Sequence, residues 1–240
     1  MATSTIDATY QGVVRKLVQS ATVNWVSQVR NSSIASQVFT YTSSSTVSDA
    51  FNVAYDTGRT GQVGQCNRVL LFFDVSSITA SNTITAAILK VWNPNAGGPT
   101  DSIIVKGSAW GGNGSTTTLS NANYNDLDFS TAYSAKDLAW AGTSYNDFYL
   151  NGTAISDMNS NGYLNCFLIE GDYDYDGQNP IINDGPYPGA VRFLDATNKI
   201  KVELTYSPIG YGNNPIGVTA DSVGEILGVA KASVSTFLGV

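Results

Sequence analysis

The sequence predicts an all-β protein folded as an antiparallel β-sandwich. At least six short segments have the continuous or alternating apolar pattern of β-strands, and loops rich in Gly, Asn, Pro and Ser separate them. Charged residues make up only 13% of the chain, about half of the usual share, while Ser, Thr, Asn, Gly and Tyr are abundant. Because little of the chain shows helical periodicity, these segments favour a sandwich over an alternating α/β fold.

The chain has 240 residues, which is enough for one domain with a sizeable core and terminal extensions. We expect an N-terminal segment or arm over residues 1–48, the sandwich over residues 49–207 and a C-terminal attachment tail over residues 208–240. The structure of the first segment stays open. Its apolar residues between positions 10 and 21 follow helical spacing, whereas their β-branched side chains favour a strand.

The strands of the sandwich are expected at residues 69–75, 84–92, 103–105, 148–150, 164–169, 190–194 and 199–206, with a single helical turn at 153–158. The first of these strands is a nearly continuous apolar run, as expected of a strand that is covered on both faces. The second and the last alternate, which predicts one buried face and one wet face. Leu89, Val91, Val202 and Leu204 should therefore face the core.

Several of these segments carry a resemblance to a known family. Residues 68–78 (RVLLFFDVSSI) and 84–91 (ITAAILKV) are similar to the core of DNRLRE-type jelly-roll modules, which occur in carbohydrate-binding and cell-surface proteins. Residues 148–153 and 162–169 resemble two later strands of that family, and residues 201–206 resemble its last strand.

The resemblance covers about residues 49–207, and it is stronger in the order and pattern of the segments than in residue identity. A Pro-Arg pair that precedes the last strand in the family is replaced here by Lys199 and Ile200. The resemblance implies a jelly-roll antiparallel β-sandwich with short terminal extensions, and by itself it implies no ligand.

The last 25 residues repeat themselves every eleven positions, with Ile-Gly-Val at 216–218 and Leu-Gly-Val at 227–229 and 238–240. Within each unit the apolar residues have the spacing of a short helix, and the glycine stands where such a helix would end. A unit of this size cannot bury its own apolar face, so we expect it to dock on another surface. The residues expected to make these assembly contacts are Val223, Ile226, Leu227, Val234, Phe237 and Leu238.

This tail is similar to the short terminal repeats of tailed-phage virion proteins. The first ten residues also lack the basic and apolar regions of a signal peptide. A jelly roll with such a tail and no secretory signal suggests a phage structural component that is assembled in the host cytoplasm.

Composition argues against several classes of partner. The net charge of −7 disfavours binding to a nucleic-acid backbone or to an anionic membrane, because both need clustered Lys and Arg. No stretch reaches the roughly 18 to 20 apolar residues of a membrane-spanning helix. Cys66 and Cys166 lie far apart in the sequence, and we interpret both as small buried apolar residues rather than as a disulfide.

The chain contains no histidine, which argues against an enzyme. Its absence removes the usual general base, the histidine-dependent nucleophiles and histidine metal sites. A glycosidase needs only two carboxylates, but no pair stands out among the scattered acidic residues. We therefore expect no enzymatic activity.

One acidic run has the pattern of the first half of a calcium loop. Asp172, Asp174 and Asp176 alternate, and Gly177 follows them. The glutamate that completes such a loop is absent, because Asn183 stands at the twelfth position. The run suggests a Ca²⁺ site through these three carboxylates, with a solvated acidic loop at a strand end as the alternative.

Three aromatic residues, Trp110, Tyr173 and Tyr175, stand beside glycine or acidic residues in expected loops and are candidates for contact with a glycan. Core packing or a contact between subunits would use the same side chains equally well, because large aromatic rings dominate both kinds of surface.

The sequence thus predicts a non-enzymatic phage virion structural protein, a capsid decoration or fibre component located in the virion. We expect it to attach to other virion protein chains or to form homo-oligomers through its terminal segments. The alternative is a carbohydrate-binding or adhesin module.

Overall fold

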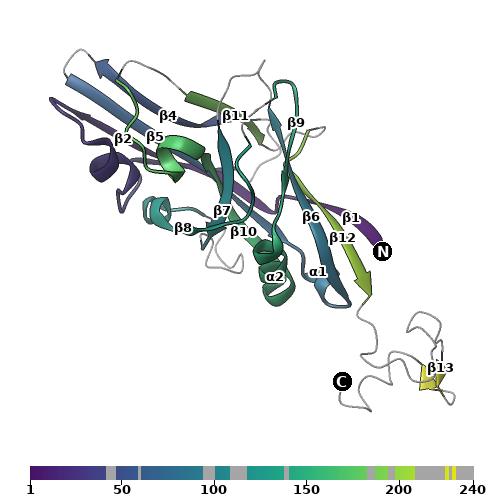
Figure 1. The fold of residues 1–240 in the computed structure, drawn as a ribbon. Helices are drawn as coiled ribbons and strands as arrows, with labels where there is room; N and C mark the ends of the chain where they lie inside the picture. Colours follow the sequence, from purple (N-terminus) through teal and green to yellow (C-terminus); the bar gives the residue numbers. More distant parts are fainter. Residues whose placement is uncertain are drawn as a thin grey trace.

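Figure 1 shows the fold in a computed structural model, which describes residues 1–41, 47–58, 61–93, 101–108, 118–137, 141–182, 187–193, 198–208, 225–226 and 229–230. Two β-sheets form the body of the protein. The four-stranded sheet, called here the small sheet, contains in order β1 (Ala2–Asp7), β12 (Lys201–Pro208), β6 (Asn82–Asn93) and β9 (Ser144–Tyr149).

The large sheet has eight strands. Six of them follow the order β11 (Tyr187–Phe193), β4 (Val47–Gly58), β5 (Gly61–Asp74), β10 (Tyr163–Glu170), β7 (Ser102–Gly107) and β8 (Leu127–Ala132), and β2 (Tyr10–Ser20) pairs with both β5 and β3 (Gln37–Tyr41). All of these strand pairs are antiparallel. The predicted all-β antiparallel sandwich is confirmed, and every strand expected from the sequence overlaps an observed one.

The central strand of the large sheet is β5, which is long enough to pair with two strands along one edge. Its first half pairs with β4 and its second half pairs with β10, while β2 follows nearly its whole length on the other edge. Figure 1 shows that β2, β4 and β5 extend away from the small sheet toward one end of the molecule, so the sandwich is elongated.

The N-terminal region belongs to both sheets. We expected residues 1–48 to lie outside the sandwich, but β1 pairs with β12 in the small sheet and β2 pairs with β5 in the large one. The expected boundary at residue 48 falls inside β4. With β1 to β3 included, the two sheets hold twelve strands, whereas a simple jelly roll has eight.

The ambiguity of residues 10–21 is resolved as a strand over Tyr10–Ser20. Val13 packs into the core between the sheets, and Val14 packs into a second core on the opposite face of the large sheet. Because both faces are covered at this point, apolar residues stand next to each other and the period of two disappears from the sequence.

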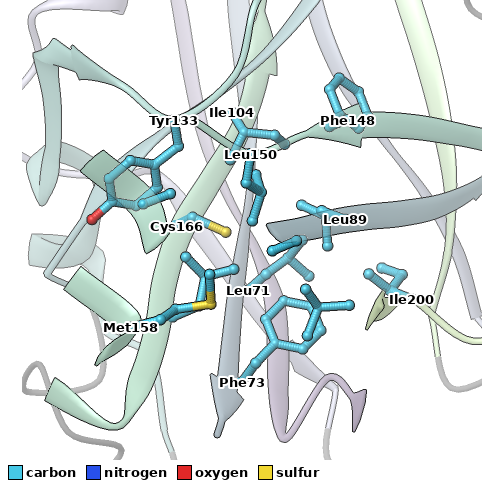
Figure 2. Close-up of a cluster of buried hydrophobic side chains, with 14 of the residues drawn as sticks. Leu71, Phe73, Leu89, Ile104, Tyr133, Phe148, Leu150, Met158, Cys166 and Ile200 are labelled. Atoms are coloured by element: carbon cyan, nitrogen blue, oxygen red, sulfur yellow. The ribbon is translucent and has the colours of Figure 1, made fainter. Parts of the chain in front are cut away.

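The first core fills the space between the two sheets, as Figure 2 shows. It contains Leu89, Val91, Val202 and Leu204, each at most 1% exposed, so the predicted inward face of the small sheet is confirmed. From the large sheet, β5 contributes Val69, Leu71 and Phe73, and β10 contributes Leu164, Cys166 and Leu168.

The second core lies on the other face of the large sheet and includes Leu70, Phe72, Phe167 and Ile169. Among the residues that the structure describes, no second sheet covers this face. Instead, two short helical turns supply large buried side chains, namely Trp25 and Val29 from the turn Trp25–Arg30 and Tyr124 from the turn Asn121–Asn125. The continuous apolar run of β5 therefore has both faces buried, as the sequence predicted.

Two short helices join strands at one end of the sandwich, α1 (Ser76–Thr79) and α2 (Gly152–Asn161). The helical turn expected at 153–158 is confirmed and extends to ten residues. The Asn151 side chain caps its start by accepting hydrogen bonds from the backbone N–H groups of Thr153 and Ala154, and Gly162 ends it at a φ of 75°. Within the described ranges, no helix is long and apolar enough to cross a membrane.

Part of the repeat tail forms a small β-ladder rather than a helix. β13 (Glu225–Ile226) and β14 (Val229–Ala230) pair antiparallel, with Ile226 opposite Val229. The prediction of a short helix ending at Gly228 is therefore wrong for this unit. Two residues, Leu227 and Gly228, separate the strands in the sequence, and this spacing is typical of a tight β-hairpin.

Candidate functional site

The acidic run occupies a compact loop at the end of β10, called here the acidic loop (residues 170–177). Gly171–Tyr175 form a π-helical turn, and Glu170 caps it. The Glu170 carboxylate accepts hydrogen bonds from the backbone N–H groups of Asp172 (3.0 Å), Tyr173 (2.6 Å) and Asp174 (3.0 Å). Burial raises the pKa of Glu170 to about 7, although the three backbone donors act in the opposite direction.

The acidic loop is anchored to the large sheet by an ion pair between Asp174 and Arg68 of β5. Two hydrogen bonds join the guanidinium to the carboxylate, from Nε to Oδ2 at 2.9 Å and from Nη2 to Oδ1 at 2.7 Å. Both side chains are completely buried. Two charges removed from water in this way need each other, because either one alone would remain uncompensated in an apolar core.

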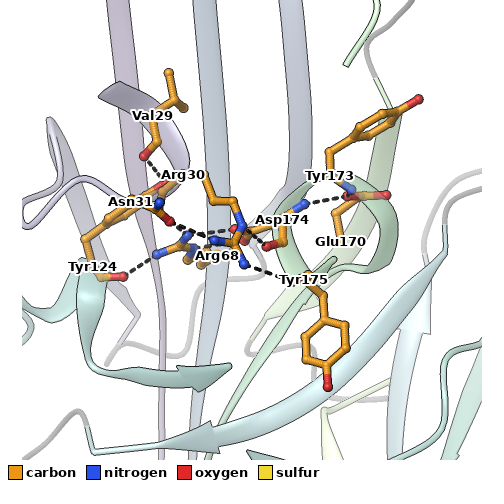
Figure 3. Close-up of polar contacts among 9 residues, drawn as sticks. All are labelled: Val29, Arg30, Asn31, Arg68, Tyr124, Glu170, Tyr173, Asp174 and Tyr175. Atoms are coloured by element: carbon orange, nitrogen blue, oxygen red, sulfur yellow. Dashed lines mark hydrogen bonds and ion pairs between the residues drawn. The ribbon is translucent and has the colours of Figure 1, made fainter. Parts of the chain in front are cut away.

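The rest of the Arg68 guanidinium is also hydrogen-bonded to the protein (Figure 3). Its Nη1 donates to the backbone oxygen of Tyr124 at 2.6 Å and its Nη2 donates to that of Arg30 at 2.7 Å, while the guanidinium carbon lies 4.0 Å from the centre of the Tyr124 ring. Arg30 in turn donates to the backbone oxygens of Asp174 and Tyr175. All three guanidinium nitrogens of Arg68 bond to protein atoms, so this network holds segments together and presents no cation to a ligand.

The three aspartates that suggested a Ca²⁺ site do not converge. Asp174 points into the protein toward Arg68, whereas Asp172 and Asp176 both pair with the ammonium group of Lys136, at 2.8 Å and 2.6 Å. Lys136 and Arg68 thus supply the positive charge that a calcium ion would bring. In the part of the chain that the structure describes, no group of three or more acidic or Cys residues is placed to hold a metal. The calcium half-motif is corrected to a loop closed by ion pairs.

The structure describes two of the three predicted glycan-contact residues. Tyr173 and Tyr175 are half-buried and pack against the second core from the acidic loop. Trp110 lies outside the described residues. Cys66 and Cys166 are free, buried and in different cores, which confirms their interpretation as small apolar residues.

The assembly residues predicted in the tail lie almost entirely outside the described residues. This applies to Val223, Leu227, Val234, Phe237 and Leu238. Ile226 is placed by its backbone in β13.

The outer face of the small sheet is a different surface, and it carries accessible charged, hydroxyl and aromatic side chains. Strand pairing aligns outward-facing residues in rows across this sheet. The charged row consists of Asp7, Lys201, Lys90 and Asp147. Lys90 pairs with Asp147 at 3.0 Å and with Glu203 at 3.4 Å. The hydrogen bond to Asp147, helped by attraction to both carboxylates, raises the pKa of Lys90.

Beside the charged row lies a row without a basic residue, formed by Thr5, Glu203, Ile88 and Tyr149. The Tyr149 side chain on the edge strand β9 is 70% exposed. A hollow of about 370 Å³ opens on the same face, over residues 3–5 of β1, 86–88 of β6 and 203–205 of β12. The outer face of the small sheet is therefore the candidate binding surface of this protein.

Sequence reasoning missed Arg68 and Glu170, the two charged residues on which the acidic loop depends. A signal for Arg68 exists: an arginine directly before an apolar run that is buried on both faces needs an acidic partner. Sequence reasoning also missed the exposed Tyr149. The strand pattern shows that this side chain points outward, but it does not show whether another segment covers the outer face.

Comparison with known proteins is negative, since no protein-family model and no curated protein matches this chain.

Proposed function

We propose that this chain is a non-enzymatic phage virion structural protein, a capsid decoration or fibre component that attaches or oligomerises through its terminal segments. The observation that carries the proposal is the pairing of the first and last strands of the sandwich. Ala2 lies opposite Tyr206, so the start of β1 and the end of β12 lie at the same end of the small sheet.

The elongated shape supports this role. Figure 1 places the N-terminus and the end of β12 at one end of the molecule and the β4–β5 hairpin at the other. The tip of that hairpin is the Gly58–Gly61 pair. An elongated body held by one end projects its opposite end, which is the geometry of a decoration or fibre protein.

The composition of the tail supplies a driving force for attachment. Each exposed Val, Ile, Leu or Phe side chain that becomes buried contributes about 1.5 to 3 kcal/mol. A symmetric assembly repeats such a contact at every subunit, so modest contacts add up to a stable particle.

The proposal is tested by ending the chain at Pro208, after the last strand of both sheets. Light scattering coupled to size-exclusion chromatography gives the mass of each species, and a thermal melt shows whether the sandwich is folded. We expect the full chain to be oligomeric and the shortened chain to be a folded monomer. Identical oligomeric states for the two folded proteins would contradict the proposal.

Two tail variants of unchanged length test whether the apolar residues of the tail make the contact. Phe237→Asp with Leu238→Asp places two charges on residues expected to be anchors, and Ser233→Asp with Ser235→Asp places the same charges on polar positions of the same repeat. Only the first pair should dissociate the oligomer. Equal effects of both pairs would indicate a general effect of charge rather than docking of the apolar residues.

A further inference from the structure

We propose that the C-terminal tail (residues 209–240) of one copy docks on the outer face of the small sheet of a second copy, over the hollow between β1, β12 and β6. The inference rests on the proposed function, which makes the tail an attachment device, and it names the surface that receives the tail. The hollow of about 370 Å³ opens over residues 3–5, 86–88 and 203–205.

The receiving surface is accessible in the single chain. Thr5 on β1 and Ala86 on β6 are exposed, and Tyr149 on β9 is 70% exposed. Ile88 connects the Tyr149 ring to the hollow, because it lines the hollow and stands directly opposite Tyr149 in the β6–β9 register. Directly paired residues of an antiparallel ladder point to the same side, with their Cβ atoms about 5 Å apart. The small sheet therefore presents an accessible apolar surface formed by Ala86, Ile88 and the Tyr149 ring.

The tail begins beside this surface. β12 ends at Pro208, and Thr205 of the same strand lines the hollow. The chain from residue 209 to residue 240 can span roughly 100 Å when it is fully extended. It can therefore reach the hollow of a second copy whose small sheet lies against the same end. In a two-fold pair each tail reaches the hollow of the partner, so the same contact forms twice and the pair closes.

The hairpin in the tail offers a partner for the apolar surface. Ile226 of β13 stands opposite Val229 of β14, so two apolar residues of the repeat lie side by side in the ladder. Within the described residues this ladder has two strands, and the outer edges of such a ladder carry backbone N–H and C=O groups that can pair further. The hydroxyls of Thr3, Thr5 and Thr205 make no side-chain hydrogen bond to any residue of the described segments, and each can donate one hydrogen bond and accept two. They can therefore bond to the backbone of a docked hairpin.

Charge complementarity favours the tail as the occupant. Glu203 is the one ionised side chain among the described residues that line the hollow, and it is 39% exposed. Its partner Lys90 lies 3.4 Å away and is nearer to Asp147, at 3.0 Å. One cation shared between two carboxylates leaves negative charge that a further cation can neutralise. The tail has a single basic residue, Lys231, which directly follows β14. The ion pair expected between the two copies joins Glu203 to Lys231.

A charge exchange in the full chain tests this ion pair. Glu203→Lys and Lys231→Glu each place like charges at the contact, so each should weaken the association, measured by light scattering over a dilution series, by at least about tenfold. The variant with both substitutions restores opposite charges and should return the association to within about threefold of the wild type. The matched control is Asp56→Lys, which reverses an acidic residue on β4 of the large sheet. A thermal melt of each variant shows whether it is folded.

Disulfide trapping shows which copy receives the tail, and it does not depend on the charge variants. One full chain carries Thr5→Cys and another carries Ala230→Cys, and the two are mixed and exposed to a mild oxidant. The native Cys66 and Cys166 are buried, so they should stay reduced. We expect a disulfide between the two different chains. Little or none should form when Thr5→Cys is replaced by Ile181→Cys, which places the thiol at an exposed position (64%) outside this sheet.

Three outcomes would overturn the proposal. The first is that ending the chain at Pro208 gives a monomer whereas Glu203→Lys and Lys231→Glu keep the oligomeric mass, or lower it without recovery in the double variant. The tail would then dock on another surface, and the proposed function would stand. The second is that the mixed chains form no disulfide with each other, while a chain carrying both Thr5→Cys and Ala230→Cys links to itself, which would show that the tail covers its own sheet. The third is that the full chain is monomeric, in which case the proposed self-assembly fails as well.

Discussion

Arg68 and Asp174 form a fully buried, doubly hydrogen-bonded ion pair between residues that are 106 positions apart in the chain. The pair joins the central strand of the large sheet to the acidic loop, and the same guanidinium holds the backbone of two further segments. The ion pair therefore holds together segments that also contribute buried apolar side chains, such as Val29 and Tyr124, to the second core.

Removing the acidic partner should be costly. Asp174→Asn leaves the Arg68 charge buried without a counter-ion, for which we expect a loss of about 3 to 5 kcal/mol in the free energy of unfolding. Urea denaturation measures this loss. The matched control is Asp172→Asn, because that carboxylate is 40% exposed in its ion pair with Lys136 and should contribute less than about 1 kcal/mol. A loss no larger than that of the control would show that the buried pair contributes little.

Replacing both partners should be better tolerated than replacing one. The double variant Arg68→Met with Asp174→Leu removes both charges together, so no buried charge remains unpaired. It still leaves the backbone oxygens of Tyr124 and Arg30 without their donor, at about 1 to 3 kcal/mol each. We expect the double variant to be more stable than either single variant in urea. Additive losses would indicate that the two side chains act independently.

The stability of the protein should fall as the pH rises toward neutrality because of Glu170. Its pKa is about 7 in the folded protein, compared with an ordinary value of 4.5. Between these pH values the folded state binds a proton that the unfolded state has released, so the contribution is full at acidic pH and is lost as the pH passes through 7. The contribution is on the order of 3 kcal/mol.

Glu170→Gln isolates this effect, since the amide does not titrate. The free energy of unfolding of the wild type minus that of the variant should decrease between pH 4.5 and pH 7. A difference that remains constant over this interval would show that Glu170 titrates as an ordinary glutamate.

The core between the sheets should respond strongly to truncation at Leu204, which is 1% exposed. Leu204→Ala should cost about 2 to 5 kcal/mol, from lost burial and from the cavity that remains. The neighbouring Thr205 points to the outer face, so Thr205→Ala serves as the control and should change the melting temperature little. Equal shifts for both variants would mean that the inward and outward faces of β12 are assigned wrongly.

Calcium should leave the stability unchanged. A ligand that binds only the folded state raises the melting temperature with its concentration. Because Asp172 and Asp176 already pair with Lys136, and Asp174 already pairs with Arg68, we expect no shift in the melt on adding Ca²⁺ or a chelator. A calcium-dependent rise would show that the metal displaces Lys136 from the acidic loop.

The alternating pattern of β6 and β12 was enough to predict both their existence and their inward residues, because each strand has one buried and one accessible face. The apolar run of β5 likewise predicted a strand covered on both sides. Such one-strand patterns depend only on local geometry, in which neighbouring side chains point to opposite faces. The sequence by itself therefore determined the fold class and most of the strands.

The tertiary structure decided what covers each face and which distant residues meet. Residues 10–20 read equally well as a helix until both faces of the large sheet proved to be buried, with Val13 in one core and Val14 in the other. The acidic run matched half of a calcium loop until Lys136 and Arg68, both far away in the sequence, reached its carboxylates. A local pattern encodes the chemistry of a segment, but its counter-charges and its covering surface come from chain folding over long separations, and no short spacing records them.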